Sequence, residues 1–363
     1  MDWMQGMRLG SIQVHQRTGS DGSMKEIEAP EFLAYKREFP VLDTRSPAEY
    51  DAGHLPGAIS FPLFDNKERE IIGTLYKEKG KQYAIREGLR IIGPKMIGFI
   101  DKASALQSSQ FLVHCWRGGM RSQSMAWLLE LYGFSVWVLK GGYKAYRNAS
   151  LTYFENPPSL RVLTGATGSM KTALLKQLRE MGEQVVDLEA LANHQGSSFG
   201  NQLSTGQPTT EQFQNDLFDA FLALDPKSHV WIEDESFSIG RVHLIEPLYR
   251  QMQLAPHYHL KLPLEKRIDV LLGDYGGLSS EKLIKAIEGI ARKLGIGNTR
   301  QAIAHVEAGE LGKAAALVLN YYDRAYQKGI QKKWNKVVGE SYVSADNLKG
   351  TAEQLINYGK GEH

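Results

Sequence analysis

A short apolar run that ends in a cysteine constrains the fold of this chain more than any other feature. Residues 111–114 (Phe-Leu-Val-His) have the length and character of a buried strand, and Cys115 follows directly. A glycine-bearing loop then leads into a segment with apolar residues at helical spacing, namely Met125, Leu128, Leu129 and Tyr132. A strand that enters a helix through such a loop is the repeating unit of parallel α/β folds.

Cys115 occupies the position in this unit where chemistry is expected. Backbone N–H groups converge at the N-terminus of a helix, and together with nearby arginines they stabilise an anion bound on or beside the sulfur. Although a lone cysteine is often a buried core residue, this setting favours a nucleophile or group carrier. We predict that Cys115, Arg117 and Arg121 carry the chemistry and that the loop is completed by Trp116, Gly118, Gly119 and Met120.

The preceding segment extends this unit into a domain. Residues 40–45 (Pro-Val-Leu-Asp-Thr-Arg) predict a strand with a charged end, and Ser46 followed by Pro47 is a typical helix start. Because reactive groups collect at the carboxyl ends of parallel strands, we expect Asp43 and Arg45 to support the Cys115 site.

We therefore expect an α/β fold in more than one domain, as the length of 363 residues also indicates. A loose leader is expected over residues 1–24, a parallel α/β domain over 25–150 and a linker over 151–159. A second α/β domain is expected over 160–263, and a helical C-terminal region over 264–363.

The second domain opens with the strand–loop–helix context of a phosphate-binding P-loop, so we predict a P-loop NTPase-like α/β domain. Such a loop cradles a diphosphate with its amides, and its lysine reaches the outer phosphate. Met170 departs from the pattern, because it stands where the second glycine of G-x-x-x-x-G-K-[ST] is usual. The predicted diphosphate-binding residues are Gly165, Ala166, Thr167, Gly168, Ser169, Met170, Lys171 and Thr172.

Two further strands of this domain end in carboxylates. Residues 185–186 lead to Asp187, and residues 229–232 lead to Glu233 and Asp234. Acids at such strand ends hold a water molecule or Mg²⁺ in P-loop proteins. We predict that these three side chains support the P-loop site and that Mg²⁺ is a possible participant, without a dedicated metal site.

Composition and charge narrow the class of protein. A net charge of +2 neither indicates nor excludes nucleic-acid binding. No apolar run approaches membrane-spanning length and the start lacks a signal-peptide layout, so we expect no membrane association. The single cysteine rules out an intrachain disulfide framework and suits a reducing cytoplasm. A sulfur or selenium atom loaded on Cys115 has no resolving thiol in its own chain, so a second substrate must discharge it.

The helical C-terminal region carries many basic residues, which can form a phosphate-facing surface or simply a solvated face. They are Arg292, Lys293, Arg300, Arg324, Lys328, Lys332, Lys333 and Lys336.

With these features in place, the chain resembles a known pairing of domains. The N-terminal part resembles a rhodanese domain in residues 43–50, in Gly53-His54-Leu55-Pro56-Gly57-Ala58 and in the Cys115 loop. The whole, from about Val41 to Tyr326, is similar to bacterial tRNA 2-selenouridine synthases. Beyond the P-loop, that similarity rests on Asp187-Leu188-Glu189-Ala190-Leu191-Ala192, Gly196-Ser197-Ser198-Phe199-Gly200, Glu233-Asp234-Glu235-Ser236 and the loop from Cys115 to Ser122.

The resemblance implies a two-step modification of the wobble 2-thiouridine of certain tRNAs. The sulfur is first alkylated from geranyl diphosphate, and the S-geranyl group is then displaced by selenium from selenophosphate, which gives 2-selenouridine. No tightly bound cofactor is implied. We expect the P-loop to serve geranyl transfer and the Cys115 loop to take selenophosphate, with Arg117 and Arg121 on its phosphate part.

Two alternatives from other classes remain open. One is a rhodanese-type sulfurtransferase with a regulatory nucleotide-binding domain. The other is a cysteine-dependent phosphatase, because Cys115 and Arg121 have the spacing of that class. A loop of this length suits a tetrahedral phosphate, whether in selenophosphate or in a phosphoester, so spacing alone does not separate these interpretations.

Overall fold

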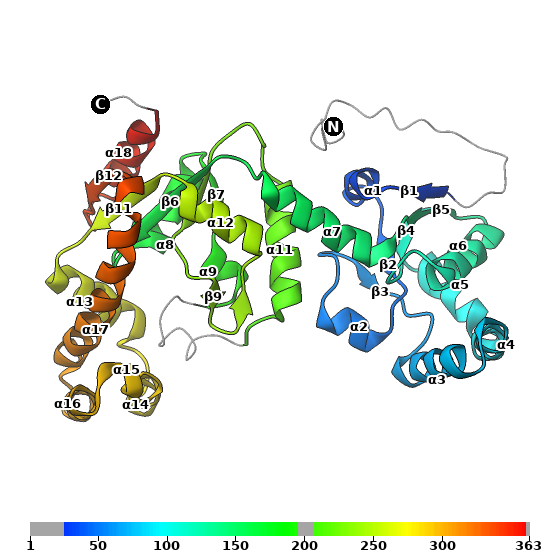
Figure 1. Ribbon diagram of the computed structural model, residues 1–363, viewed down its shortest axis with the longest axis horizontal. Coiled ribbons are helices and arrows are strands. Elements are labelled where there is room, and N and C mark those ends of the chain that lie inside the picture. The colour runs from blue at the N-terminus through cyan, green and yellow to red at the C-terminus, as the bar shows by residue number, and fades with distance from the viewer. Residues whose placement is uncertain (1–24, 195–205, 361–363) are drawn as a thin grey trace. The chain divides into compact units, whose positions relative to one another are not determined.

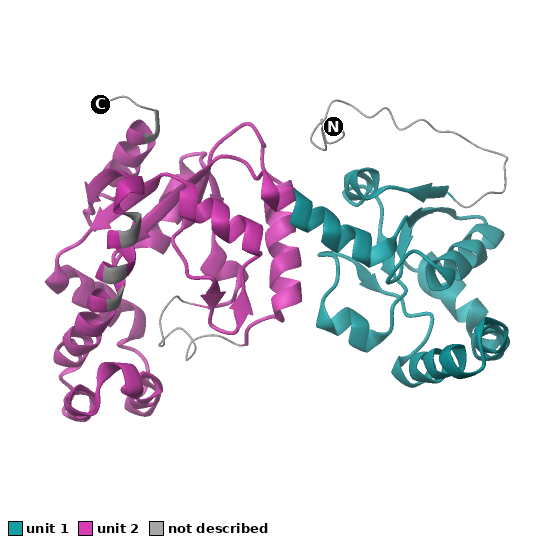
Figure 2. Ribbon diagram, in the orientation of Figure 1, with its two compact units in different colours: residues 1–152 teal, residues 153–363 magenta. Residues whose placement is uncertain are grey.

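The computed structural model describes residues 25–194 and 206–360, which belong to two compact units, residues 1–152 and 153–363 (Figure 2). The predicted leader 1–24 and the glycine-rich segment 196–200 lie outside the described residues. Each unit is built on a parallel sheet of five strands, which confirms the predicted α/β class. The division falls inside helix α7 (Gly142–Glu155), so the predicted linker is helical up to Glu155.

The sheet of the first unit has the strand order β1-β5-β4-β2-β3. Its central strand β4 is buried from Phe111 to His114 because apolar side chains cover both faces. Asp43 is opposite His114 in the register of β2 and β4, so the ends of these strands lie together, as predicted. The strands are β1 (Lys25–Ile27), β2 (Val41–Asp43), β3 (Ile59–Ser60), β4 (Gln110–His114) and β5 (Ser135–Leu139).

Two helices of this unit, α2 and α6, lie where the sequence predicts them, and helices α1, α3, α4 and α5 were not predicted. Helix α2 begins with a capping box between Ser46 and Glu49, and α6 buries Met125 and Leu129 in the core while Tyr132 is exposed. Helices α3 and α4 are joined by a short turn and pack together as a helical hairpin (Figure 1). The helices are α1 (Ala29–Tyr35), α2 (Pro47–Ala52), α3 (Asn66–Glu78), α4 (Lys81–Ile92), η1 (Gly93–Lys95), α5 (Met96–Ser104), α6 (Met120–Tyr132) and α7.

The sheet of the second unit has the order β12-β11-β6-β8-β7, with β6 at its centre. Its strands are β6 (Leu160–Gly165), β7 (Gln184–Val186), β8 (Val230–Glu233), β11 (His257–Lys261) and β12 (Val337–Tyr342), and β9 (Ser238–Ile239) pairs with β10 (Val242–His243) in a separate ribbon. The helices before the C-terminal region are α8 (Lys171–Glu180), α9 (Leu188–Leu191), α11 (Thr210–Leu222) and α12 (Glu246–Leu254).

The C-terminal region is mostly helical, but one strand corrects the prediction. Strand β12 pairs in parallel with β11, so the end of the chain completes the P-loop sheet, and α18 packs on α8 and β12. No local sequence pattern predicts this pairing, because β12 pairs with residues some 80 positions earlier in the chain. The remaining elements are α13 (Leu264–Tyr275), α14 (Ser280–Gly289), α15 (Ala291–Leu294), α16 (Ile296–Glu307), α17 (Leu311–Lys333), η2 (Trp334–Lys336) and α18 (Leu348–Lys360).

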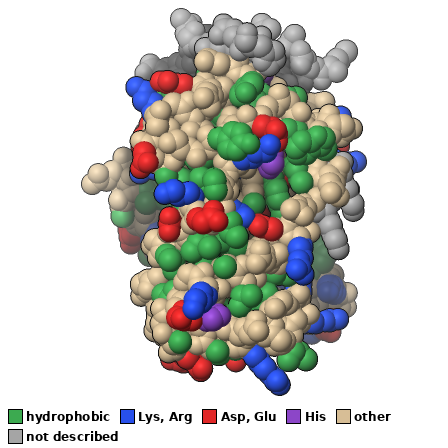
Figure 3. Space-filling view, turned by 90° about the vertical axis from the view of Figure 1, so that its left-hand side faces the viewer, with side chains coloured by type: hydrophobic (Ala, Val, Ile, Leu, Met, Phe, Trp, Pro, Cys, Tyr) green, Lys and Arg blue, Asp and Glu red, His purple; other side chains and the backbone are tan. Residues whose placement is uncertain are grey.

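The surface of this region mixes side chains of every type. On the face shown in Figure 3, acidic and basic side chains are interspersed with apolar ones. The exposed apolar residues of the region include Trp334 and Tyr342. Among the described residues, no helix combines the length and apolar character that crossing a membrane requires.

Candidate active sites

Cys115 lies at the carboxyl end of β4, immediately before the loop that leads into α6. Its side chain is 3% exposed. The buried Ser122 hydroxyl donates a hydrogen bond of 3.2 Å to the sulfur and also lies 3.0 Å from the Gly119 carbonyl oxygen. Ser122 is absent from the predicted site residues, although it follows Arg121 directly in the motif. It supplies the sulfur with a hydrogen-bond donor.

The loop after Cys115 is held against the start of α7. The N–H groups of Tyr143 and Lys144 donate to the carbonyl oxygens of Cys115 and Trp116 at 2.8 and 3.0 Å. Because a trans peptide is planar, the N–H groups of Trp116 and Arg117 point the opposite way, away from α7. None of the N–H groups of residues 116–119 donates to another described residue. Free amides in one loop form an anion-binding nest.

The two predicted arginines differ in their surroundings. Arg117 is exposed and has no ion pair with a described residue. Arg121 is paired with Glu49 of α2, with Nη1 2.5 Å from Oε2 and Nη2 3.3 Å from Oε1. Burial alone would raise the pKa of Glu49, but the hydrogen bond and the charge of Arg121 bring it below its ordinary value. Arg117 is therefore available to an anion, whereas Arg121 is oriented by a carboxylate.

Asp43 and Arg45 form a buried ion pair next to the Cys115 site. Both side chains are fully buried, and Arg45 donates to both Asp43 oxygens and, at 2.7 Å, to the Gly53 carbonyl oxygen. The guanidinium also lies 3.8 Å from the centre of the Tyr143 ring. This pair joins the end of β2 to the start of α7, on which the Cys115 loop rests.

An apolar cavity of about 490 Å³ opens beside the Cys115 loop. Its walls are the α3–α4 hairpin and the loop itself, including Cys115, Trp116 and Met120. Most of the other lining side chains are apolar: Leu63, Phe64, Ile72, Tyr76, Ala84, Ile85, Leu89 and Ile92. The basic side chains of Arg69, Lys77, Lys81, Arg117 and Arg121 also line it. Such a cavity suits an apolar chain that ends at an anion.

In the second unit, β6 leads through the predicted P-loop into α8. Met170 adopts a left-handed backbone with φ +65°, the conformation for which glycine is usual, and its side chain packs against the core. The chain thus keeps the backbone geometry of the motif despite the substitution. Lys171 Nζ donates to the Gly165 carbonyl oxygen at 2.9 Å.

The helical region packs directly on this loop. Arg267 of α13 forms two hydrogen bonds with Asp323 of α17, at 2.7 and 2.6 Å, and a third of 3.2 Å with the Thr167 carbonyl oxygen. A Cβ at Gly168 would lie 3.1 Å from the Arg267 carbonyl oxygen, so glycine permits the close approach. Tyr326 of α17 lies 3.2 Å from the Thr164 hydroxyl at the end of β6.

The predicted acids divide into structural and pocket-lining groups. Glu233 is buried and accepts from the Glu189 N–H at 2.7 Å, and it does not line the pocket. Asp187 caps α9 and Asp234 accepts from Thr164 at 2.9 Å, but both also face the pocket.

Two further acids in the pocket, Glu189 and Glu235, are absent from the predicted site residues, although both lie in the quoted motifs. Burial raises the pKa of both, and the charge of Glu189 helps to raise that of Glu235 to about 8. A hydrogen bond joins the two side chains, so they share a proton at neutral pH.

The P-loop pocket has a volume of about 690 Å³, and Lys171, Thr172 and the loop residues line one side of it. Among the described residues, no three His, Cys, Asp or Glu side chains are arranged to hold a metal ion. Mg²⁺ in P-loop sites is held by the Thr hydroxyl, one carboxylate and substrate phosphate, and Thr172 and Asp234, which both line the pocket, are the side chains that would hold it here.

Comparison with known proteins identifies the domains that carry both loops. A family model described as the rhodanese-like domain matches residues 27–149, and one described as the tRNA 2-selenouridine synthase AAA domain matches residues 158–350. The chain belongs to the tRNA 2-selenouridine synthase family. Its rhodanese domain contains the Cys115 loop, and its AAA domain contains the P-loop.

Full-length relatives agree with this assignment. The chain is 36% identical to the tRNA 2-selenouridine synthase of Shewanella denitrificans, with 86% of this chain and 94% of the relative covered. It is 34% identical to that of a Sulfurovum species, with 88% of each covered. It is 37% identical to that of Shewanella sp. strain MR-7, with 88% and 94% covered.

Proposed function

We propose that this synthase converts the wobble 2-thiouridine of tRNA to 2-selenouridine through an S-geranyl intermediate. The observation that carries the proposal is the apolar cavity beside the Cys115 nest, in a chain that also has a P-loop. An S-geranylated nucleotide has an apolar chain next to the atom that reacts, and selenophosphate is an anion. One site therefore suits both reactants of the second step.

In the first step, the 2-thio sulfur attacks C1 of geranyl diphosphate. The sulfur–carbon bond forms as the carbon–oxygen bond breaks, diphosphate leaves with the electron pair, and the N3 proton of the base passes to solvent. Lys171 and the amides of the P-loop stabilise the developing charge. Mg²⁺ bound by Thr172 and Asp234 would offset the charge of the neighbouring acids.

In the second step, the amides of residues 116–119 and Arg117 hold the phosphate part of selenophosphate. Cys115 attacks phosphorus and releases selenide, which bonds to C2 of the base as geranylthiolate leaves. Water then hydrolyses the phosphoryl–cysteine bond, and geranylthiolate takes up a proton. Arg121, held by Glu49, positions the loop. The apolar cavity takes the geranyl chain while the bond between its sulfur and C2 of the base breaks.

A further cavity, which lies in the helical C-terminal region, supports a binding surface for tRNA there. Lys293 of α15 and Arg324 of α17 line a pocket of about 380 Å³ with Asn298, Asn320 and Tyr321. Neither cation has an ion pair with a described residue. The two cations suit two neighbouring tRNA phosphates, and the two amides and the aromatic ring suit a nucleoside. We place the reaction in the reducing cytoplasm, where the lone Cys115 stays a thiol.

The proposal is tested by mass spectrometry of nucleosides from 2-thiouridine tRNA incubated with the protein. We expect an S-geranyl nucleoside after geranyl diphosphate is added, and 2-selenouridine after selenophosphate follows. Intact 2-thiouridine at both stages would contradict the proposal and favour a phosphatase or sulfurtransferase.

A further inference from the structure

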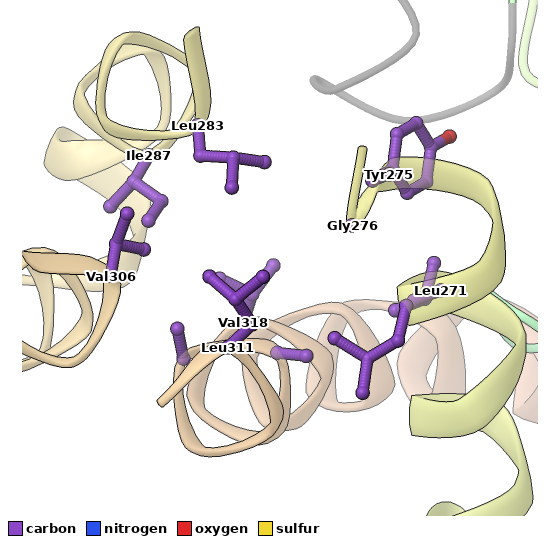
Figure 4. Close-up of a pocket in the computed structure, with 11 residues that line it drawn as sticks. Leu271, Tyr275, Gly276, Leu283, Ile287, Val306, Leu311 and Val318 are labelled. Carbon is purple, nitrogen blue, oxygen red and sulfur yellow. The ribbon is translucent and has the colours of Figure 1, made fainter. Parts of the chain in front are cut away.

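A small apolar hollow adjoins the P-loop pocket within the helical region. Helices α13, α14, α16 and α17 surround it, and their side chains face one another across a central gap (Figure 4). Leu271 and Tyr275 of α13 line both the hollow and the P-loop pocket. The two spaces therefore meet at these two residues.

The hollow differs from the pocket in character. Its inner wall consists of buried apolar side chains, among them Leu283 and Ile287 of α14 and Val318 of α17. No charged side chain lines it, whereas Lys171 and several carboxylates line the P-loop pocket. A ligand that enters both spaces must have a charged head and an apolar tail.

The size of the hollow sets the length of that tail. Its volume is about 50 Å³. A cavity needs about 10–15 Å³ to hold one water molecule, so the hollow has room for a small apolar group of a few heavy atoms. One isoprene unit has five carbons, which matches this capacity.

We propose that the hollow binds the terminal isoprene unit of geranyl diphosphate while the P-loop binds the diphosphate. This inference rests on the proposed function, which makes geranyl diphosphate the alkyl donor. The first isoprene unit lies in the pocket along Leu271 and Tyr275, and the second enters the hollow. The hollow makes the AAA domain select geranyl over shorter prenyl chains.

The test fills the hollow without touching the P-loop. Ala315 of α17 lines the hollow, and its neighbour Ala316 does not, so Ala315→Leu and Ala316→Leu are a matched pair. Binding of geranyl diphosphate, dimethylallyl diphosphate and inorganic diphosphate is measured by calorimetry on the full chain. We expect Ala315→Leu to weaken geranyl diphosphate binding about tenfold and to leave the two shorter ligands within about twofold, because only the longer tail reaches the hollow. Ala316→Leu should leave all three unchanged.

Several outcomes would overturn the inference, and they separate it from the proposed function. If inorganic diphosphate binds but geranyl diphosphate binds no more tightly, the hollow takes no tail while the P-loop role stands. An Ala315→Leu protein with unchanged geranyl diphosphate affinity would have the same meaning. Equal weakening of all three ligands would show that the hollow only shapes the loop. If none of the three ligands binds the parent protein, the proposed P-loop function fails together with the inference.

Discussion

Gly118 of the Cys115 loop and Gly142, the first residue of α7, contact each other backbone to backbone. A Cβ on Gly142 would collide with the Gly118 nitrogen and with the Cys115 carbonyl oxygen. Both glycines have positive φ, +65° and +59°. The loop that carries Cys115 therefore packs directly on the first residue of α7, and no side chain fits between them.

We expect Gly142→Ala to lower the free energy of unfolding and to abolish selenium transfer, because the loop must shift to admit the Cβ. Gly133 is the matched control, since it also has positive φ but a Cβ added there would meet no other atom within 4 Å. Gly133→Ala should cost only the left-handed backbone penalty of about 1–2 kcal/mol, and Gly142→Ala at least about 2 kcal/mol more. Urea denaturation measures both, and equal losses would show that the contact is unimportant.

At position 170 we expect glycine to give a more stable protein than alanine, which is the reverse of their usual order in a helix. Met170→Ala removes core packing and keeps the left-handed strain, whereas Met170→Gly removes the packing and relieves the strain. We expect the glycine variant to be more stable than the alanine variant by about 1 kcal/mol. Thermal or chemical denaturation decides the order, and a more stable alanine variant would contradict the assigned backbone conformation.

The sequence predicted the local parts of both sites, and it missed the contacts between distant segments. The Cys115 loop and the P-loop were recognisable because a strand, a glycine loop and a helix are consecutive in the chain. The pairing of Arg121 with Glu49 joins residues 72 positions apart, so no local pattern reports it. The α3–α4 hairpin has the pattern of two ordinary amphipathic helices, and only the tertiary fold makes it the wall of the Cys115 cavity.

The acid pair of the P-loop pocket predicts a pH dependence of stability. The pKa of Glu235 is raised to about 8 by burial and by the charge of Glu189, so the folded protein keeps a proton that the unfolded chain loses near pH 4.5, the ordinary pKa of a glutamate. Stability is therefore lost as the pH rises from about 4.5 through 8, by at most about 1.4 kcal/mol per pH unit. Glu235→Gln should remove this loss. Chemical denaturation of ligand-free protein from about pH 5.5 to 8.5 measures the difference, and parallel curves for the two proteins would refute it.

The cations of the helical region predict how salt affects tRNA binding. Replacing Lys293 and Arg324 by alanine should weaken binding and lower the slope of log affinity against log salt by about 1.4–1.8, because two phosphate contacts are lost. Alanine at the exposed Lys227 and Lys349 removes the same charge away from the pocket and is the control. Filter binding over a salt series provides the slopes. If both double variants change the slope equally, net charge rather than this pocket explains the effect.

If the Cys115 loop and the P-loop perform separate steps, nucleoside mass spectrometry of one variant in each loop will show two different products. Wild type, Cys115→Ser and Lys171→Ala are each incubated with 2-thiouridine tRNA, geranyl diphosphate and selenophosphate. We expect Cys115→Ser to accumulate S-geranyl-2-thiouridine without 2-selenouridine, and Lys171→Ala to form little of either. Selenium incorporation by Cys115→Ser at the wild-type rate, or an equal loss of geranylation in both variants, would contradict the division of labour between the rhodanese and AAA domains.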